Sequence, residues 1–417
     1  MMEIKSLNEC HAIVSVPGSK SYTHRALIVS ALADGESLLK NTLSSEDTDY
    51  TLRGLEALGV TFRLKEDGLH SFGLGGKLKA NEKLFVGNSG TSMRFLCALA
   101  ALGNGRTVLD GSERMRCRPM GGLLEGLGAL GVRTYSEGGQ GYPPVTVESH
   151  GLKGGTARIR GEESSQFLSA LLMISPWAEQ DVTLEVSGSL SSRPYVDMTV
   201  SVMSAFGVEV QREGYTSFFM KAGQRYLPRT YFIEGDASNA SYFFSAAAVT
   251  GGTVRVENFP SASLQGDSAF LSILEKMGCE VTRSEGWAQV RGGELRGIEI
   301  DMKAMPDLVP TLAVTAAFAR GKTVIRNIEH LRFKESDRIA ALAAELSKLG
   351  VRVEEGRDWI TVEGGKMHGA EIETYHDHRL AMSFSIAGLA VPGVRIKEER
   401  CVDKSFPAFW ETLKKLY

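Results

Sequence analysis

Six polar segments along the chain combine helix-capping residues with cations or glycine, a mixture suited to binding anions. A helix N-terminus offers free backbone N–H groups and the positive end of the helix dipole, and both favour phosphate or carboxylate. Capping explains the serine, threonine, asparagine and aspartate at these positions, but not the lysine, histidines and glycine among them. We therefore expect ligands at these helix starts. The segments are 19–21, 88–91, 164–166, 236–238, 306–307 and 376–378.

Three arginines strengthen this interpretation. Arg25, Arg94 and Arg379 each lie about one turn inside an apolar stretch that follows one of the polar segments. An unpaired charge inside an apolar helix is costly, so these positions favour arginines that meet an anionic ligand.

The same residues argue against a metal or another cofactor. His376, Asp377 and His378 are adjacent, and neighbouring residues rarely converge on one ion. The five cysteines are scattered and contain no CxxC pair, which predicts neither a zinc site nor a disulfide framework. We expect no metal and no cofactor.

Composition excludes several classes of protein. The chain of 417 residues carries a net charge of −3, so it has no global basic field for nucleic acid or an anionic membrane. Its apolar stretches are too short to span a bilayer, and its first residues do not resemble a signal peptide. We expect a cytoplasmic protein, monomeric, with no nucleic-acid or membrane partner.

An internal repeat indicates how the helix starts are positioned. Amphipathic segments end in a glycine and a following strand at intervals of 71 to 76 residues, at Gly59, Gly131, Gly207, Gly278 and Gly350. Glycine there suits a left-handed helix C-cap. A second signature, an apolar helix followed by a turn and a β-rich strand, recurs six times at a similar interval. Each repeat should hold two helices and several strands.

Six such repeats predict two pseudo-symmetric α/β domains of three repeats each. One repeat cannot bury both of its helices, so three should pack around a shared helical centre. A six-repeat solenoid is the structural alternative. The capping segments favour the two-domain arrangement, because they combine residues suited to ligands.

Ten short motifs resemble the 5-enolpyruvylshikimate-3-phosphate synthase family, and they occur in family order across nearly the whole chain. One such motif is weak evidence, but ten in register are highly specific. They lie at Pro17–Ser21 with Arg25, Gly87–Arg94, Arg114–Pro119, Ser164–Leu168, Ser192–Asp197, Glu234–Ser238, Pro306–Asp307, Lys334–Arg338, Asp377–Arg379 and Lys404–Pro407.

The resemblance implies a fold, two substrates and a pathway. The fold is α/β, with two domains of three βαβαββ units each, an inside-out α/β barrel of the enolpyruvyl transferase type. One domain would comprise residues 16–234 and the other residues 1–15 with 235–417, and the domains would close on shikimate 3-phosphate. The reaction would transfer the enolpyruvyl group of phosphoenolpyruvate to the 5-hydroxyl of shikimate 3-phosphate and release phosphate, on the shikimate pathway to chorismate and aromatic amino acids.

The resemblance also assigns roles. Asp307 would accept the proton of the 5-hydroxyl, and Lys20, Glu335 and Lys404 would deliver and remove the other protons. Shikimate 3-phosphate would meet Ser21, Arg25, Ser164, Ser165, Ser192 and Tyr195. Phosphoenolpyruvate would meet Lys20, Gly90, Arg118, Gln166, Arg338, Arg379 and Lys404. Asn88, Thr91, Arg94 and Lys334 complete the predicted substrate-binding set. Two carboxylates, Asp307 and Glu335, are set against seven matched cations, which suits two substrates that each carry a phosphate and a carboxylate. The seven are Lys20, Arg25, Arg94, Arg118, Arg338, Arg379 and Lys404.

Simpler interpretations and rival families stay open at this point. Lys20 and Lys404 are typical of solvated surface lysines, and Asp307, Ser164 and Ser165 of helix caps. Rival activities are a UDP-N-acetylglucosamine enolpyruvyl transferase, suggested by Cys117 before Arg118, and an RNA-end-binding protein of the RNA 3′-phosphate cyclase type. An inactive repeat scaffold is the remaining alternative.

Three positions depart from the common family pattern. Phe95 follows Arg94 where many relatives carry proline, His330 stands where many carry asparagine at the shikimate phosphate, and Leu380 follows Arg379 where methionine is common. The resemblance makes glyphosate the family's inhibitor, bound where phosphoenolpyruvate binds. We expect these departures to alter affinity and inhibitor response but not the reaction type.

Overall fold

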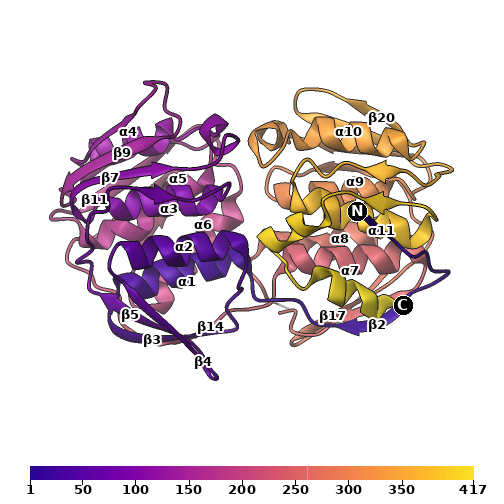
Figure 1. The fold of residues 1–417 in the computed structure, drawn as a ribbon, viewed down its shortest axis with the longest axis horizontal. Helices are drawn as coiled ribbons and strands as arrows, with labels where there is room; N and C mark the ends of the chain where they lie inside the picture. Colours follow the sequence, from indigo (N-terminus) through magenta and orange to yellow (C-terminus); the bar gives the residue numbers. More distant parts are fainter. Residues whose placement is uncertain (261) are drawn as a thin grey trace. The chain divides into compact units, whose positions relative to one another are not determined.

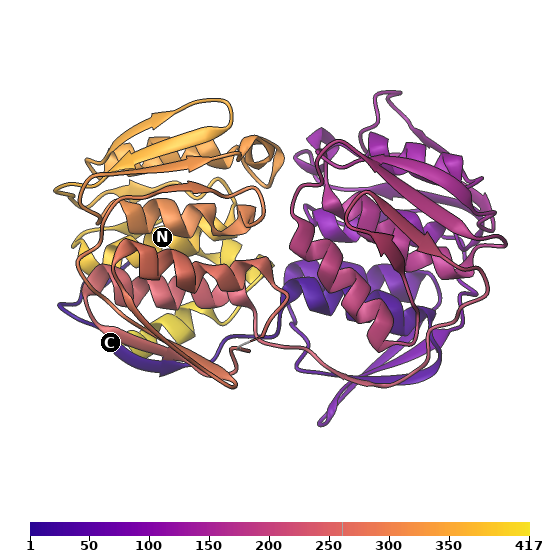
Figure 2. The same cartoon turned by 180° about the vertical axis from the view of Figure 1, so that it is seen from behind.

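A computed structural model of the chain describes residues 1–260 and 262–417. The chain divides into two compact units, which we call the first unit, residues 18–233, and the second unit, residues 1–17 and 234–417. The backbone passes from one unit to the other after Pro17 and again after Ile233. Strands lie along the margins of each unit and helices in its interior (Figures 1 and 2).

The first unit contains three four-stranded sheets, ordered β14-β3-β5-β4, β6-β7-β9-β8 and β10-β11-β13-β12. In each sheet the first pair is parallel and the others are antiparallel. The helices are α1 Lys20–Leu32, α2 Glu46–Ala57, α3 Gly90–Ala100, α4 Gly121–Ala129, α5 Ser165–Ile174 and α6 Arg193–Ala205, with 3₁₀ turns η1 Met115–Cys117 and η2 Ser175–Trp177. The strands are β3 Asp34–Lys40, β4 Thr61–Lys65, β5 Gly68–Leu74, β6 Leu84–Phe85, β7 Asn104–Asp110, β8 Arg133–Ser136, β9 Val145–His150, β10 Gly155–Arg160, β11 Val182–Ser187, β12 Gln211–Glu213, β13 Ser217–Met220 and β14 Thr230–Phe232.

The second unit has two four-stranded sheets, β16-β17-β15-β2 and β18-β19-β21-β20, and a three-stranded sheet, β1-β23-β22. Its helices are α7 Ala237–Thr250, α8 Phe270–Met277, α9 Val309–Ala316, α10 Arg338–Lys348, α11 His378–Ala390 and α12 Phe409–Leu413. Its 3₁₀ turns are η3 Gly266–Ala269, η4 Pro306–Leu308, η5 Glu329–Phe333, η6 Glu399–Lys404 and η7 Lys414–Leu416. Its strands are β1 Met2–Glu3, β2 His11–Val14, β15 Thr253–Val256, β16 Glu280–Ser284, β17 Trp287–Arg291, β18 Glu299–Asp301, β19 Lys322–Arg326, β20 Arg352–Glu355, β21 Trp359–Glu363, β22 Glu371–Ile372 and β23 Arg395–Ile396.

The element order repeats as β-α-β-α-β-β, from β2 through α1, β3, α2, β4 and β5 to the last repeat, which ends in α12. The opening strands of the first and fourth repeats are exchanged, because β2 pairs with β15 in the second unit and β14 pairs with β3 in the first. This exchange requires the chain to pass between the units twice.

The apolar helix of each repeat supplies the core. Helices α1, α3 and α5 are buried along almost their whole length and contribute to one hydrophobic cluster in the first unit, and α7, α9 and α11 do the same in the second. In the second unit α11 packs against both α7 and α9 (Figure 1). The fold is therefore not a solenoid, because three repeats share each core.

The predicted glycine caps are confirmed. Gly59, Gly131, Gly207, Gly278 and Gly350 all have φ between 88° and 111° and follow α2, α4, α6, α8 and α10. These left-handed values explain why glycine recurs at the end of each amphipathic helix.

Candidate active site

Arg25 is a buried cation at the beginning of the first unit's central helix α1. Its side chain is enclosed by neutral acceptors: Nε donates to Thr199 Oγ1 at 2.7 Å, Nη1 to the Ser21 carbonyl at 2.9 Å and Nη2 to the Tyr195 carbonyl at 3.0 Å. No carboxylate of the described residues forms an ion pair with Arg25, and burial lowers the pKa of Arg25 to about 10. The guanidinium therefore carries a charge that an anion would neutralise.

The starts of α3 and α5 are joined by a second arginine. Arg94 Nη1 donates to Gln166 Oε1 at 3.0 Å, and Gln166 Nε2 donates to Thr91 Oγ1 at 3.0 Å. Arg118, which follows η1, donates to the Asn88 carbonyl at 3.2 Å. The structure thus brings together predicted residues from three distant sequence segments.

Gly90 lies between the two arginines. A Cβ placed on Gly90 would come within 2.5 Å of both Arg118 Nη2 and Arg94 Nη1. From the sequence we expected the missing side chain to leave room for a ligand. In the structure that room is occupied by the guanidinium groups. The immediate role of glycine is therefore to let both guanidinium groups approach the backbone closely.

Lys20 forms an ion pair that the sequence analysis missed. Its Nζ lies 2.9 Å from Oδ2 of Asp47, a buried residue in the first turn of α2. The motif Ser45–Thr48 reads as an ordinary capping box, and that box is present, so only the packing of α2 reveals the partner of Lys20. Lys20 is not the solvated surface lysine of the simpler interpretation.

The predicted serines at the starts of α5 and α6 differ in local geometry. Ser164 Oγ caps α5 by accepting from Gln166 N at 3.2 Å, and Ser165 is buried in the first turn. Ser192 precedes α6 with φ 53° and makes no side-chain capping bond. A left-handed serine that does not cap its helix is strained, a feature that clusters at ligand sites.

In the second unit Asp307 is held between two arginines. Its Oδ1 accepts from Arg338 Nη1 at 3.2 Å and its Oδ2 from Arg379 Nη2 at 2.6 Å, while Lys334 Nζ lies 4.0 Å from Oδ1. Asp307 stands inside the 3₁₀ turn η4, and its carboxylate faces the arginines from α10 and α11. The helix-cap interpretation of Asp307 is therefore wrong.

Arg338 is the centre of this cluster. Besides Asp307, it donates from Nη2 to Glu335 Oε2 at 2.8 Å and from Nε to Asp377 Oδ2 at 2.7 Å. Burial by itself lowers the pKa of Arg338, but the charges of Asp377, Glu335 and Asp307 raise it well above the usual value. The arginine therefore stays charged and fixes the orientation of three carboxylates.

The structure places the remaining predicted residues in the same unit. Lys404 is buried at the end of η6. His330 lies in η5, where burial and the charge of Lys334 lower its pKa to about 4, so the imidazole is neutral at pH 7.

Two carboxyl groups near the Arg338 cluster, those of Asp377 and Asp267, were not among the predicted site residues. Asp377 was interpreted as a cap; it caps α11 through Arg379 N at 3.0 Å and also binds Arg338. Asp267, in η3, is buried and accepts a hydrogen bond from Ser238. Burial and the nearby charge of Asp307 raise the pKa of Asp267 to about 7. An ordinary Gln-Gly-Asp-Ser stretch gives no signal for such a carboxyl group.

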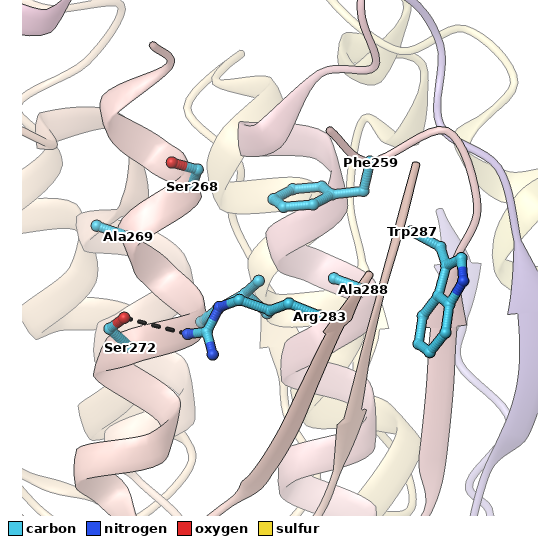
Figure 3. A pocket seen from close by; sticks show the side chains of 8 residues that line it. Phe259, Ser268, Ala269, Ser272, Arg283, Trp287 and Ala288 are labelled. Atoms are coloured by element: carbon cyan, nitrogen blue, oxygen red, sulfur yellow. Dashed lines mark hydrogen bonds between the residues drawn. The ribbon is translucent and has the colours of Figure 1, made fainter. Parts of the chain in front are cut away.

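A separate hollow of about 180 Å³ lies in the second unit beside α8 and the β16–β17 hairpin (Figure 3). Its lining includes Phe259, Ser272, Arg283 and Trp287 and none of the predicted site residues. Arg283 is neutralised by Glu275 at 2.7 and 2.8 Å, so this hollow does not offer an anion site.

Comparison with known proteins agrees with this geometry. The profile of the family EPSP synthase (3-phosphoshikimate 1-carboxyvinyltransferase) matches residues 4–413. The chain belongs to this family. The 3-phosphoshikimate 1-carboxyvinyltransferase of Nostoc punctiforme is 50% identical over 414 residues, which cover 98% of this chain and 97% of the relative. That of Sulfurovum sp. is 46% identical over 420 residues, covering 99% and 98%.

A solved EPSP synthase from Acinetobacter baumannii has the same fold. It superposes with a TM-score of 0.83 at 30% identity and covers 99% of this chain and 97% of that one. Membership of the EPSP synthase family over almost the whole chain displaces the two rival families, whose features were confined to a cysteine position and a general fold likeness. Of the helices in the described residues, none has the length and apolar character needed to cross a membrane.

Proposed function

We propose that this EPSP synthase family member transfers the enolpyruvyl group of phosphoenolpyruvate to the 5-hydroxyl of shikimate 3-phosphate in the cytoplasm. The observation that carries the proposal is Asp307, a carboxylate held at 3.2 and 2.6 Å by two buried arginines. A proton acceptor fixed among cations is what the reaction needs, because the substrates are anions and the reacting hydroxyl must lose a proton.

The first unit is proposed to bind shikimate 3-phosphate. The charge of Arg25 is met by hydroxyl and carbonyl oxygens, so a phosphate can supply the missing negative charge. The hydroxyls at the starts of α1, α5 and α6 can complete the set. The residues are Ser21, Arg25, Ser164, Ser165, Ser192 and Tyr195.

Phosphoenolpyruvate is proposed to be bound by cations that are already anchored within their own units. Arg118 and Gln166 are already anchored beside Gly90, and Arg338 and Arg379 are anchored by Asp307. Lys20 and Lys404 complete this set. Asn88, Thr91, Arg94 and Lys334 support it through the contacts at Gln166, Arg118 and Asp307.

The chemistry proceeds by addition and elimination. Asp307 takes the proton of the 5-hydroxyl as its oxygen bonds to C2 of phosphoenolpyruvate, and the methylene carbon gains a proton from Lys20, Glu335 or Lys404. The tetrahedral adduct then loses phosphate from C2 as the methyl group returns a proton, which restores the double bond. The residues act by holding charge and moving protons.

Phosphate release tests the proposed function directly. We expect release only when both substrates are present, and undiminished release with EDTA. Release with UDP-N-acetylglucosamine in place of shikimate 3-phosphate, or abolition by EDTA, would contradict the proposal.

The short loop around η1 provides a matched pair of variants. Arg118→Ala should raise KM for phosphoenolpyruvate, because the Arg118 side chain reaches the Asn88 carbonyl just before α3. Arg116→Ala is the control, since Arg116 pairs with Asp110 at 2.6 Å and is half-exposed. Equal KM values for the two variants would remove Arg118 from the binding set.

A further inference from the structure

The turn that leads into α11 has an unusual backbone. Tyr375 and His376 have φ values of 53° and 54°, so two successive residues with full side chains adopt the left-handed conformation. Such residues carry conformational strain and persist only where the surrounding structure holds them. Asp377 follows at once, so the strained turn delivers a residue of the candidate active site.

Glu345, on α10, anchors the entry to this turn, while Glu398 contacts its far side at His376. Its carboxylate is fully buried, and Oε2 accepts from the backbone N–H of Glu373 at 3.0 Å while Oε1 accepts from the Tyr375 hydroxyl at 2.8 Å. Lys348 Nζ lies 2.9 Å from Oε1 and 2.7 Å from Oε2. One side chain thus ties Glu373 and Tyr375, the entry to the strained segment, to helix α10.

The turn passes this constraint to the arginine cluster. Asp377, immediately after the turn, accepts from Ser336 Oγ at 3.0 Å and from Arg338 Nε at 2.7 Å, and it is fully buried. Arg338 in turn binds Asp307. A continuous series of contacts therefore runs from Glu345 through the turn and Asp377 to Arg338 and Asp307.

We propose that Glu345 is a positioning residue for the reaction: by anchoring the strained turn, it fixes Asp377 and with it the orientation of Arg338. Glu345 contacts no reacting group, since its partners are the turn and Lys348. The inference rests on the proposed function in so far as Arg338 binds phosphoenolpyruvate.

The number of acceptors explains why this position suits a carboxylate. The backbone N–H and the phenol need separate oxygens, and Glu345 supplies one to each. Glutamine keeps an oxygen for the N–H and an amide that can donate to the phenol oxygen. Glu345→Gln should therefore preserve the turn, whereas Glu345→Ala removes both anchors.

Kinetics with three variants test the proposal. Glu345→Ala should lower kcat/KM for phosphoenolpyruvate by about 10- to 100-fold, the effect of a small misplacement of a binding group, and leave KM for shikimate 3-phosphate within about 3-fold. Glu345→Gln should lose less than about 3-fold. Lys348→Ala is the control, because it removes the ion pair but leaves both oxygens on the turn. Equal losses in Glu345→Ala and Lys348→Ala would overturn the proposal.

Glycine provides a rescue that a purely structural role would not show. Since glycine adopts the left-handed conformation without strain, His376→Gly in the Glu345→Ala background should recover several-fold of the lost kcat/KM. His376→Gly alone serves as the reference. Failure of the double variant to exceed Glu345→Ala would overturn the idea that Glu345 acts by holding a strained turn.

Hydrogen exchange separates this proposal from the proposed function. Glu345→Ala should accelerate amide exchange at residues 373–377 and leave exchange in the β20–β21 hairpin unchanged. If the wild-type protein released no phosphate from the two substrates, the proposed function would be wrong. Amide exchange at residues 373–377 would still show whether Glu345 holds the turn. Unchanged exchange at residues 373–377 would overturn the proposal.

Discussion

Arg25 and Arg338 are two guanidinium groups with the same burial and opposite surroundings. Each is 1% exposed and each belongs to the first turns of a helix. Arg25 is bound by hydroxyl and carbonyl oxygens, and burial lowers its pKa to about 10. Arg338 is bound by Asp307, Glu335 and Asp377, which raise its pKa despite burial.

The difference indicates two uses of a buried cation. Neutral acceptors fix the geometry of Arg25 but leave its charge available, so an anionic substrate can complete the ion pair. The carboxylates around Arg338 offset its charge, and Arg338 in turn holds them in place. Arg25 is therefore suited to meeting an anion, and Arg338 to fixing the orientation of carboxylates.

The largest effect should follow from removing Asp307, the proposed proton acceptor in the second unit. Asp307→Ala should lower kcat by about 10²- to 10⁴-fold, the usual cost of losing a general base, with a much smaller change in KM. Steady-state phosphate release measures both. Asp307→Asn serves as a control of similar shape and should be as slow; a nearly normal kcat in either variant would limit Asp307 to an ion-pair role.

The comparison itself can be tested by removing each arginine. Arg338→Met leaves buried carboxylates without their cation and should reduce the free energy of unfolding by about 3–5 kcal/mol. Arg25→Met leaves only neutral acceptors and should cost about 1–3 kcal/mol. Urea denaturation followed by circular dichroism gives both values. An equal loss of unfolding free energy in the two variants would contradict the comparison, because it would mean that the carboxylates around Arg338 and the neutral acceptors around Arg25 have the same effect on stability.

A smaller effect is expected at Gly90 in the first unit. Gly90→Ala should weaken glyphosate by about 10- to 200-fold, the range for one methyl group, because the new Cβ displaces Arg94 and Arg118. KM for phosphoenolpyruvate should also rise, since the same guanidinium groups move. Inhibition assays at fixed phosphoenolpyruvate measure the effect.

A substitution at Phe95 provides the control for the glyphosate experiment with Gly90→Ala. Its ring is buried 5.4 Å from the Arg25 guanidinium, on the same helix as Gly90. Phe95→Leu should therefore change KM for shikimate 3-phosphate more than glyphosate inhibition. If Phe95→Leu and Gly90→Ala shifted glyphosate inhibition alike, the assignment of Gly90 to the phosphoenolpyruvate site would be wrong.

A pH-dependent effect is expected at Asp267, a buried carboxyl group of the second unit with a pKa raised to about 7. Between about pH 4 and 7 the folded protein holds a proton that the unfolded chain releases. Stability from this group is therefore complete at low pH and lost as pH rises, by at most about 1.4 kcal/mol per pH unit. The stability of Asp267→Asn relative to wild type should increase from pH 5 to 7 and stay constant above about pH 8. Parallel urea curves across that range would contradict the raised pKa.

The sequence allowed much of the fold to be predicted, because the relevant signals are local. Gly59 and Gly350 marked helix ends that the backbone confirms at φ 100° and 89°. The six apolar helices could be placed from their caps and hydrophobic runs. The family motifs also predict residues for both substrates, since each motif is a short contiguous pattern that does not depend on tertiary contacts.

By itself the sequence determined the repeat, the helix starts and the family to which this chain belongs. Tertiary structure alone decided which partners the charged site residues have. Asp47 could not be matched to Lys20, nor Glu345 to Tyr375, because the partners are 27 and 30 residues apart and meet only when helices pack. Taken without the family resemblance, Asp307 is typical of a helix cap, because an aspartate beside a proline favours one locally. The arginines 31 and 72 residues further along give its carboxylate stronger partners, and their positions depend on how α10 and α11 fold against η4.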